Sequence, residues 1–437
     1  MNRRKFLKAS AAASLAFAAA PIFGADENKK YATALVGSGW WGNNILRCAI
    51  QAGRSKIVAV CDVDQRAVDR TADAVQKLSG EQPKRYGDFR ELIDKEKPEI
   101  VINATPDHWH PLITIAAVKS GAHVYVEKPI CHTVNEGRAM VNAARDADRV
   151  VQVGTHRRVS PHNVSGRDFI RSGQAGKIGM VRCFVHYGGG PENVQANEQP
   201  PAELNWDMWC GPAPLRPYNR KIHPRGFRGF LDYANGTLGD WGIHWLDQVL
   251  WIMEEKYPRK VFSTGGRAIK GKPVNDASGQ TTDAPDHQVA VYEFESFTMN
   301  WEHRQFAGNN AEKGETVGVY FYGTKGTFHQ GWLRGWTFYP VGGGEAIHQD
   351  PQLNKPDDQN IKELWADFLD AIQTKRRSIS DIETGHRSTT CALLGMLSLK
   401  LGRSLQWDGQ TESVGGDAEA NKLLSRPYRA PWQYPQI

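Results

Sequence analysis

Val36-Gly37-Ser38-Gly39-Trp40-Trp41-Gly42 is the stretch that decides the fold of the first part of this chain. It follows an apolar run, residues 31–36, and contains the pattern G-x-G-x-x-G. In a strand-to-helix turn, Gly37 permits the tight bend, Gly39 lets the backbone approach a pyrophosphate, and Gly42 lets the helix pack on the sheet. The new helix offers free N–H groups and its positive dipole end to the phosphates. The stretch predicts a dinucleotide site bordered by Trp40 and Trp41.

Around this turn, residues 31–154 alternate apolar runs with helical periodicity. Strand-like runs occupy residues 32–36, 57–60, 100–104, 123–126 and 150–153, and helical patterns fill residues 65–78 and 110–120. This alternation predicts an α/β fold that begins with a Rossmann dinucleotide-binding domain, a parallel sheet wrapped by helices.

From residue 155 to 437 the pattern changes. Strand-like segments recur at residues 181–186, 260–266, 288–294, 298–304, 316–322, 326–329 and 336–339, and helical ones at 164–172, 237–254, 360–375 and 381–402. We expect a C-terminal α+β domain with an open, mostly antiparallel sheet and helices on one face. This domain would bind the substrate, and the tail, residues 412–437, would wrap the surface.

Asp62 stands at the end of the second predicted strand, 25 residues after Gly37. A carboxylate there accepts hydrogen bonds from the adenosine ribose and repels a 2′-phosphate, which favours NAD over NADP. Two alternatives remain open from the sequence. Asp62 could be a helix cap, and Arg66 could pair with the 2′-phosphate of NADP.

The first 25 residues have the features of a twin-arginine signal peptide. Arg3, Arg4, Lys5 and Lys8 precede an Ala-rich apolar stretch, residues 9–23, which is too short to anchor a protein in a bilayer. The alternative is a basic amphipathic tail. The signal predicts a periplasmic protein exported folded by the twin-arginine machinery. Free nicotinamide cofactor is scarce there, so the cofactor should travel inside the protein.

Composition excludes some partners. The formal net charge of the 437-residue chain is +6, and removing the four signal cations lowers it to +2, which argues against nucleic acid or an anionic membrane surface. The 14 Trp suit a sugar-binding cleft. The six Cys form no C-x-x-C pair and are expected to be buried free thiols, and no ligand spacing indicates a metal site.

Two further stretches end strands at the carboxyl edge of the predicted sheet, where such folds bind ligands. They are Ala104-Thr105-Pro106-Asp107-His108-Trp109-His110 and Val126-Glu127-Lys128-Pro129. Both resemble the glucose–fructose oxidoreductase, inositol dehydrogenase and rhizopine-catabolism (Gfo/Idh/MocA) family, whose hallmark is Glu-Lys-Pro after the fifth strand. The resemblance continues through residues 176–179, 206–212 and 239–247 and covers essentially the whole mature chain.

The resemblance implies an NAD(P)-dependent oxidoreductase that acts on a hydroxyl of a sugar, cyclitol or glycoside. It implies a homo-oligomer formed through the free face of the open sheet. It also places Glu127 and Lys128 near the nicotinamide and Thr105, Pro106 and His110 along the cofactor. His110 could equally be a helix-start residue.

Lys128, Asp240 and His244 are the predicted catalytic residues. Asp240 and His244 lie four residues apart on a predicted helix, which puts them on one face, while Trp241 belongs to a separate apolar face. The imidazole would take the hydroxyl proton, Lys128 would polarise the hydroxyl and Asp240 would orient the substrate or the ring. The roles of His244 and Lys128 could be exchanged.

Arg158, His186 and Tyr187 are the predicted substrate residues, with a purely structural role as the alternative. Weaker candidates are Gln152, His156, Arg157, Tyr218, Asn219, Arg220, Arg225 and Arg228.

Three functions follow from these patterns. The leading one is an exported oxidoreductase with a retained, recycled cofactor. The second is an NAD-dependent glycosidase that oxidises, eliminates, adds water and reduces again. The third is a non-catalytic sugar-binding protein.

Overall fold

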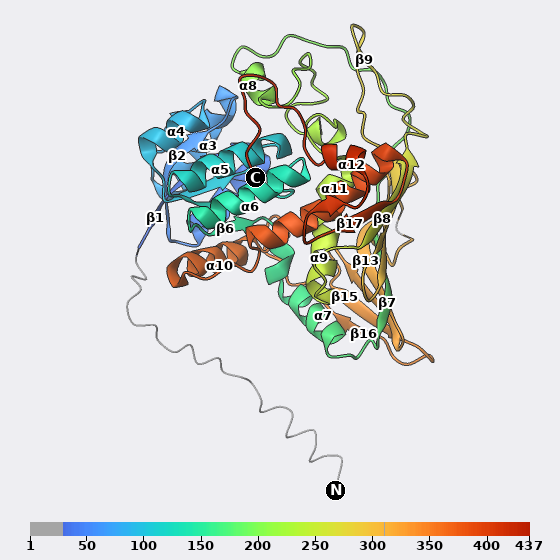
Figure 1. Ribbon diagram of the computed structural model, residues 1–437. Helices are drawn as coiled ribbons and strands as arrows, with labels where there is room; N and C mark the ends of the chain where they lie inside the picture. Colours follow the sequence, from blue (N-terminus) through green and yellow to red (C-terminus); the bar gives the residue numbers. More distant parts are fainter. Residues whose placement is uncertain (1–28, 310) are drawn as a thin grey trace.

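The computed structural model describes residues 29–309 and 311–437, so the predicted signal, residues 1–25, lies outside the described residues. The first domain contains one six-stranded sheet, and Figure 1 labels its strands β1, β2 and β6. Its strands are β1 (Tyr31–Val36), β2 (Ser55–Cys61), β3 (Lys84–Tyr86), β4 (Ile100–Asn103), β5 (His123–Val126) and β6 (Val151–Val153). All neighbours are parallel, in the order β3-β2-β1-β4-β5-β6. This doubly wound order reverses between β1 and β4, where such sheets bind ligands.

Local capping fixes where most helices of this domain begin. They are α2 (Trp40–Gln51), α3 (Gln65–Ser79), α4 (Phe89–Glu96), α5 (His110–Lys119) and α6 (Val134–Asp146). Asp64 and Asp88 accept backbone N–H groups at the starts of α3 and α4, and Thr133 with Glu136 forms a capping box on α6. The start of α2 has no side-chain cap, which leaves its N–H groups available to a ligand.

The second domain contains a ten-stranded sheet, in the order β16-β15-β14-β13-β7-β12-β11-β8-β17-β18. Its strands are β7 (Ile178–His186), β8 (Lys260–Gly266), β11 (His287–Glu293), β12 (Thr298–Arg304), β13 (Val317–Gly323), β14 (Gly326–Gly331), β15 (Trp336–Pro340), β16 (Ile347–Gln349), β17 (Leu405–Asp408) and β18 (Ser413–Val414). Within this sheet β7 and β12 are parallel and the other pairs are antiparallel. The predicted fold class is confirmed. A separate two-stranded ribbon joins β9 (Asn275–Asp276) and β10 (Gly279–Gln280).

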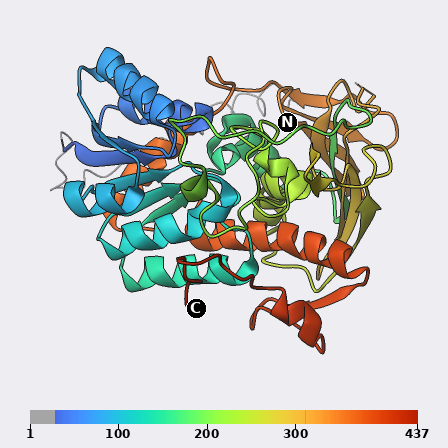
Figure 2. The ribbon, with the colours of Figure 1, turned by 90° about the horizontal axis from the view of Figure 1, so that it is seen from above.

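Helices cover one face of the large sheet, as Figure 2 shows for α9 (Ile243–Met253) and α11 (Ile382–Leu401). The remaining helices are α7 (Pro161–Arg171), α8 (Trp206–Cys210), α10 (Ile361–Thr374) and α12 (Ala418–Lys422). Short 3-10 turns are η1 (Asp107–Trp109), η2 (His156–Val159) and η3 (Gly226–Gly229), and η4 (Leu238–Gly242) is a π-helical turn directly before α9.

Two late segments return to the first domain. Trp365 and Phe368 of α10 pack on Tyr125 of β5, with ring centroids 5.7 and 6.4 Å away. In the tail, Arg426 Nε donates to Glu136 over 2.8 Å, and Trp432 meets the ring of Trp109 edge-on. The first domain is therefore completed by residues far along the chain.

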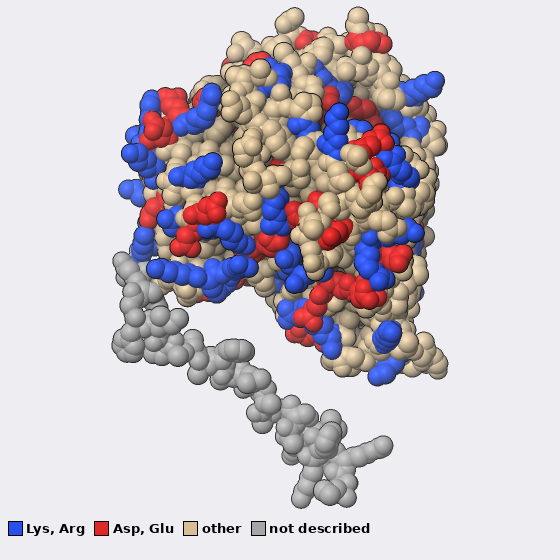
Figure 3. All heavy atoms as spheres, viewed as in Figure 1, with Lys and Arg blue, Asp and Glu red and all other residues tan. Residues whose placement is uncertain are grey.

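Figure 3 shows acidic and basic side chains interspersed over the viewed face. All six Cys are buried and free, as expected. In the described part of the chain, no helix combines the length and the apolar character needed to cross a bilayer.

A buried ion pair fastens the domain junction. Arg158 of η2 donates to both carboxylate oxygens of Asp247 on α9, at 2.8 and 2.9 Å. Ser388 of α11 donates to the same carboxylate over 2.8 Å. Three elements thus meet at one buried charge.

Replacing Asp247 with Ala should lower the free energy of unfolding by about 3–5 kcal/mol, because it leaves the Arg158 guanidinium buried and unpaired. Denaturant titration of the purified protein measures this loss. The control is Asp69→Ala, which removes a half-exposed ion pair with Arg85 and should cost about 1 kcal/mol or less. Equal losses in the two variants would contradict the role of the junction.

Candidate active site

A cavity of about 1210 Å³ lies between the carboxyl edge of the parallel sheet and the second domain. It is large enough for a dinucleotide together with a small substrate. Its walls include predicted residues from both domains: Gly37, Gly39, Trp40, Trp41, Gly42, Asp62, Thr105, Pro106, Glu127, Lys128, Asp240 and His244. The fold thus brings most of the predicted site residues together.

The glycine turn has the shape that a pyrophosphate needs. Gly37 has φ of +96°, and a Cβ on it would lie 2.6 Å from the main chain of Ala104. A Cβ on Gly42 would lie 2.0 Å from the carbonyl oxygen of Gly37. At Gly39 a Cβ would meet no protein atom within 4 Å, so this position faces open cavity. With the uncapped start of α2 beside it, the turn fits a bound dinucleotide.

Asp62 is positioned as an adenosine-ribose acceptor. Its oxygens accept the N–H groups of Ser38 at 2.8 Å and Asp64 at 3.0 Å, and burial raises its pKa to about 6. The alternative of Asp62 as a helix cap is removed, because Asp64 caps α3. Arg66 is already paired with Asp64 at 2.8–2.9 Å, which leaves it less available to a 2′-phosphate. The arrangement favours NAD.

At the other end of the cavity, Lys128 and Asp240 form an ion pair between the domains. Lys128 Nζ donates to Asp240 Oδ1 over 2.6 Å and to the Asp240 main-chain oxygen over 3.0 Å. Arg228 Nε lies 3.0 Å from the same Oδ1. Burial opposes ionisation of Asp240, but Arg228 and Lys128 outweigh it and lower its pKa to about 2. Asp240 therefore stays a carboxylate and cannot serve as the proton-accepting base near neutral pH.

His244 lies in an aromatic part of the same cavity. Its ring centroid is 5.0 Å from that of Trp332, 5.5 Å from His156 and 5.8 Å from Trp241. Burial, with Lys128 and other nearby cations, lowers the pKa of His244 well below its usual range. The imidazole is therefore neutral at pH 7, which leaves one of its ring nitrogens without a proton.

The predicted helix at residues 237–254 is interrupted, and the interruption changes the position of Trp241. A π-helical turn, η4, precedes α9, so Trp241 lines the cavity instead of joining a separate apolar face. Trp332, which sequence reasoning missed, meets Trp241 edge-on at 5.0 Å. The guanidinium of Arg157 backs Trp332 at 3.8 Å from the ring centroid. Such π-helical turns are frequent at functional sites.

Two buried carboxyls complete the reactive end of the cavity. Burial raises the pKa of Glu127, which was predicted as a site residue, to about 7. Burial also raises the pKa of Asp107 to about 7. Asp107 was missed as a site residue. The available signal was its place between Pro106 and His110, in a stretch at the carboxyl edge of the sheet.

Four predicted residues do not line the cavity. The two ring nitrogens of His110 each lie 2.7 Å from a carbonyl oxygen, Nδ1 from that of Pro129 and Nε2 from that of Thr105, so the ring joins two segments of the cavity wall. Arg158 is held by Asp247 at the domain junction. His186 points to the outer face of the large sheet, where Nε2 is 2.8 Å from Glu302. The ring of Tyr187 meets that of Trp241 edge-on, with the centroids 6.0 Å apart. Arg158, His186 and Tyr187, predicted to contact the substrate, are thus not among the residues that line the cavity.

A long segment of the second domain covers the adenosine end of the cavity. We call residues 187–235 the cover segment; it runs over the first domain in Figures 1 and 2. Its backbone bonds to the loop after β2: Gln65 N–H donates to Glu203 over 3.0 Å, and Asn205 N–H donates to Val63 over 2.9 Å. Met208, Tyr218 and His223 from this segment line the cavity.

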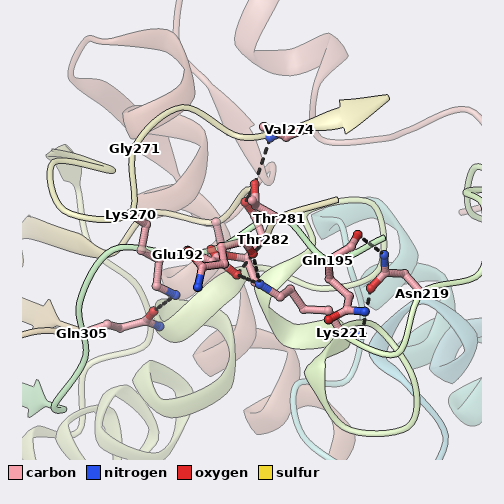
Figure 4. A network of polar contacts seen from close by, with 12 residues as sticks. Glu192, Gln195, Asn219, Lys221, Lys270, Gly271, Val274, Thr281, Thr282 and Gln305 are labelled. Carbon is pink, nitrogen blue, oxygen red and sulfur yellow. Dashed lines mark hydrogen bonds and ion pairs between the residues drawn. The ribbon is translucent and has the colours of Figure 1, made fainter. Parts of the chain in front are cut away.

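Glu192 holds the cover segment together, as Figure 4 shows. Its carboxylate accepts from Lys221 Nζ at 2.8 Å and from Thr282 Oγ1 at 2.6 Å, and Arg267 lies 3.2 Å away. Burial acts to raise the pKa of Glu192, but these donors lower it to about 2. Asn219 donates further hydrogen bonds to the carbonyl oxygens of Gln195 and Ala196.

Among residues 29–309 and 311–437, no group of three or more potential ligands is placed to hold a metal ion.

Comparison with known proteins agrees with this geometry. A model of an oxidoreductase family with an NAD-binding Rossmann fold, Gfo/Idh/MocA, matches residues 31–155. The model of the C-terminal alpha/beta domain of that family matches residues 177–267 and 282–434.

Individual curated relatives match shorter stretches of the chain than the two family models do. Levoglucosan dehydrogenase of Pseudarthrobacter phenanthrenivorans is 34% identical over 113 residues, covering 24% of this chain and 29% of the relative. A glycosyl hydrolase family 109 protein of Shewanella sp. (strain W3-18-1) is 36% identical over 93 residues, 20% of each chain. The matches thus span less than a third of these curated relatives. The crystal structure of aldose-aldose oxidoreductase from Caulobacter crescentus shares the fold, with a TM-score of 0.65, 19% identity and coverage of 86% of this chain and 100% of that one.

Asp107→Asn should stabilise the protein at high pH. Folding raises the pKa of this carboxyl from near 3.8 to about 7, so the folded state holds the proton more tightly and loses stability as pH rises from about 4 to about 7. Removing the charge should raise the free energy of unfolding by on the order of 1–4 kcal/mol at about pH 8 and change it little at about pH 4. Thermal unfolding of both proteins across this pH range measures the difference, and a gain confined to low pH would contradict it.

Proposed function

This chain belongs to the Gfo/Idh/MocA family of oxidoreductases with an NAD-binding Rossmann domain, and we propose that it is an exported dehydrogenase that oxidises a hydroxyl group of a sugar, cyclitol or glycoside. The observation that carries the proposal is the meeting of Lys128, Asp240 and His244 in the cavity that begins at the glycine turn. The similarity to levoglucosan dehydrogenase supports a sugar as the substrate class.

Bound NAD supplies a hydride acceptor. The residues of the chain do the proton chemistry. Neutral His244 accepts the hydroxyl proton, and the ammonium of Lys128 stabilises negative charge that develops on the oxygen. Asp240 holds Lys128 in place and stays ionised. Trp241 and Trp332 offer aromatic faces on which the apolar side of a sugar ring can rest.

We propose that the cofactor is retained between turnovers. The twin-arginine motif supports export to the periplasm with the cofactor inside the folded protein. The cover segment supports retention, because it closes over the adenosine end and Glu192 bonds it to Arg267 and Thr282, which lie outside the segment. A second substrate would then take the hydride back, as in coupled oxidation and reduction of two sugars.

The second candidate is a glycosidase cycle of oxidation, elimination, water addition and reduction. The buried carboxyls of Asp107 and Glu127 beside the ion pair favour it, since elimination needs a further base. The similarity to a glycosyl hydrolase family 109 protein also supports it. A non-catalytic sugar-binding role would leave this set of buried titratable groups without a purpose.

We also propose a homo-oligomer formed through the outer face of the large sheet. Met180, Phe262, Val289 and Val291 are exposed large apolar side chains on its central strands. In register, Val291 pairs with Phe262 across β8 and β11. A second copy would cover this face.

Lys128→Met and His244→Ala should each lower the rate of cofactor reduction by on the order of 100-fold or more, because each removes a group that handles the proton or its charge. The test isolates the protein from the periplasm, identifies bound nucleotide by mass spectrometry and follows nicotinamide absorbance with a panel of sugars and glycosides. His348→Ala, an exposed histidine, is the matched control. A protein that binds neither NAD nor NADP would overturn the proposal.

Glu192→Gln should speed release of the bound nucleotide by about 10-fold, because a neutral amide loses the charge-assisted bonds to Lys221 and Arg267. The rate is measured by dilution into excess labelled NAD. Glu198→Gln is the control on the same segment, since its ion pair with Arg220 is largely exposed. Unchanged release from the Glu192 variant would show that the cover segment does not retain the cofactor.

A further inference from the structure

We propose that Asp107 is a second catalytic base, which removes a proton from the carbon next to the oxidised carbon of a keto sugar. The inference rests on the proposed function, which supplies the ketone, and it adds carbon–hydrogen bond cleavage to that reaction. The ligand class is a sugar or glycoside in which one ring hydroxyl has become a carbonyl.

The location of Asp107 carries the argument. It is the first residue of η1, at the carboxyl end of β4, and lines the same cavity as Lys128, Asp240 and His244. The residue is only 2% exposed, and its Oδ2 has no hydrogen-bond partner among the described residues. A buried carboxyl without a partner is costly to keep, which suggests that it has a use.

A structural use is not evident. The residue before η1 is Pro106, and the turn has no side-chain cap. Asp107 is likewise not the partner of the nearby cations, because Lys128 and Arg228 both bond to Asp240.

The other titratable groups of the cavity are less suited to the task. His244 is occupied with the hydroxyl proton, and Asp240 is too weak a base while both cations hold it. Glu127 Oε1 is also without a hydrogen-bond partner in the described part of the chain, but this side chain is packed into the wall: Oε2 accepts the Lys128 N–H at 3.3 Å, and Oε1 lies where a Cβ on Gly154 would come within 2.2 Å. Asp107, whose side chain makes no such packing contact with any described glycine, is the better placed of the two carboxyls.

The step balances without any further reactant. The C–H bond beside the carbonyl breaks, its proton forms an O–H bond with the Asp107 carboxylate, and the electron pair moves to the carbonyl oxygen. Lys128 stabilises the resulting enolate oxygen. Return of the proton restores the ketone, whereas departure of a group from the next carbon gives elimination.

The surroundings of Asp107 suit a base that works near neutral pH. Burial raises its pKa to about 7, with Arg228 from η3 and Lys128 after β5 lowering it and Asp240 from η4 raising it. A base with this pKa is partly ionised at pH 7 and strong enough to take a proton from an acidified carbon.

The test uses the NAD-loaded full-length protein and a methyl ketoglucoside whose ring hydroxyl has been oxidised in advance. In deuterated water, wild type should catalyse deuterium incorporation next to the carbonyl, detected by NMR. Asp107→Asn should slow this exchange by on the order of 100-fold, and Asp107→Glu should restore part of it. The wild-type rate should rise with pH through about 7.

Nucleotide binding, followed by quenching of Trp fluorescence, should be equal in wild type and Asp107→Asn, which separates a lost base from a damaged fold. Absence of exchange in wild type, normal exchange in Asp107→Asn, or loss in Glu127→Gln with Asp107→Asn unaffected would overturn the assignment. Reduction of NAD by unoxidised sugars tests the proposed dehydrogenase separately, so failure of one is distinguishable from failure of the other.

Discussion

The ion pair between Lys128 and Asp240 is the interaction on which the rest of the site depends. One partner follows the fifth strand of the nucleotide-binding sheet and the other lies in the π-helical turn of the second domain. Both charges are largely withdrawn from water, so neither is stable there without the other. The pair therefore fixes the position of the two domains relative to each other at the reactive end of the cavity. Lys128 also acts on the neighbouring groups, since it lowers the pKa values of Asp107, Glu127 and His244, although burial is the larger cause for each.

Burial and charge separate the cavity groups into distinct roles. Asp240, between two cations, has its pKa lowered to about 2, while Asp107 and Glu127, buried without such pairing, have theirs raised to about 7. His244 is kept neutral by the same burial and the same cations. Identical functional groups thus become a permanent anion and candidate proton carriers, as expected where the surroundings drive pKa values apart. The contrast explains why residue type alone does not assign the chemistry.

The sequence was informative wherever the signal was local. The glycine turn, most strands of both sheets and the helices at residues 65–79 and 382–401 follow from backbone sterics and from periodicity, which act over a few residues. The three-residue strand β3 was too short to show a pattern. The π-helical turn was missed because periodicity cannot separate it from an α-helix, and that turn places Trp241 in the cavity. Trp332 and the return of α10 to the first domain depend on long-range packing that no local pattern encodes. Arg158 shows the same limit, because its partner Asp247 lies 89 residues away.

The proposed retention of the cofactor and the proposed base Asp107 favour the same kind of reaction. A simple dehydrogenase releases reduced cofactor at each turnover and gains nothing from a cover fixed over the adenosine end. A protein that keeps its cofactor must return the hydride to a carbon before it can work again. Between these two transfers the substrate is a ketone, and a ketone acidifies the neighbouring C–H bond. A buried carboxyl with a pKa of about 7 in the same cavity is then able to act during that interval. The cover segment and Asp107 are thus more consistent with a transient oxidation than with a net one.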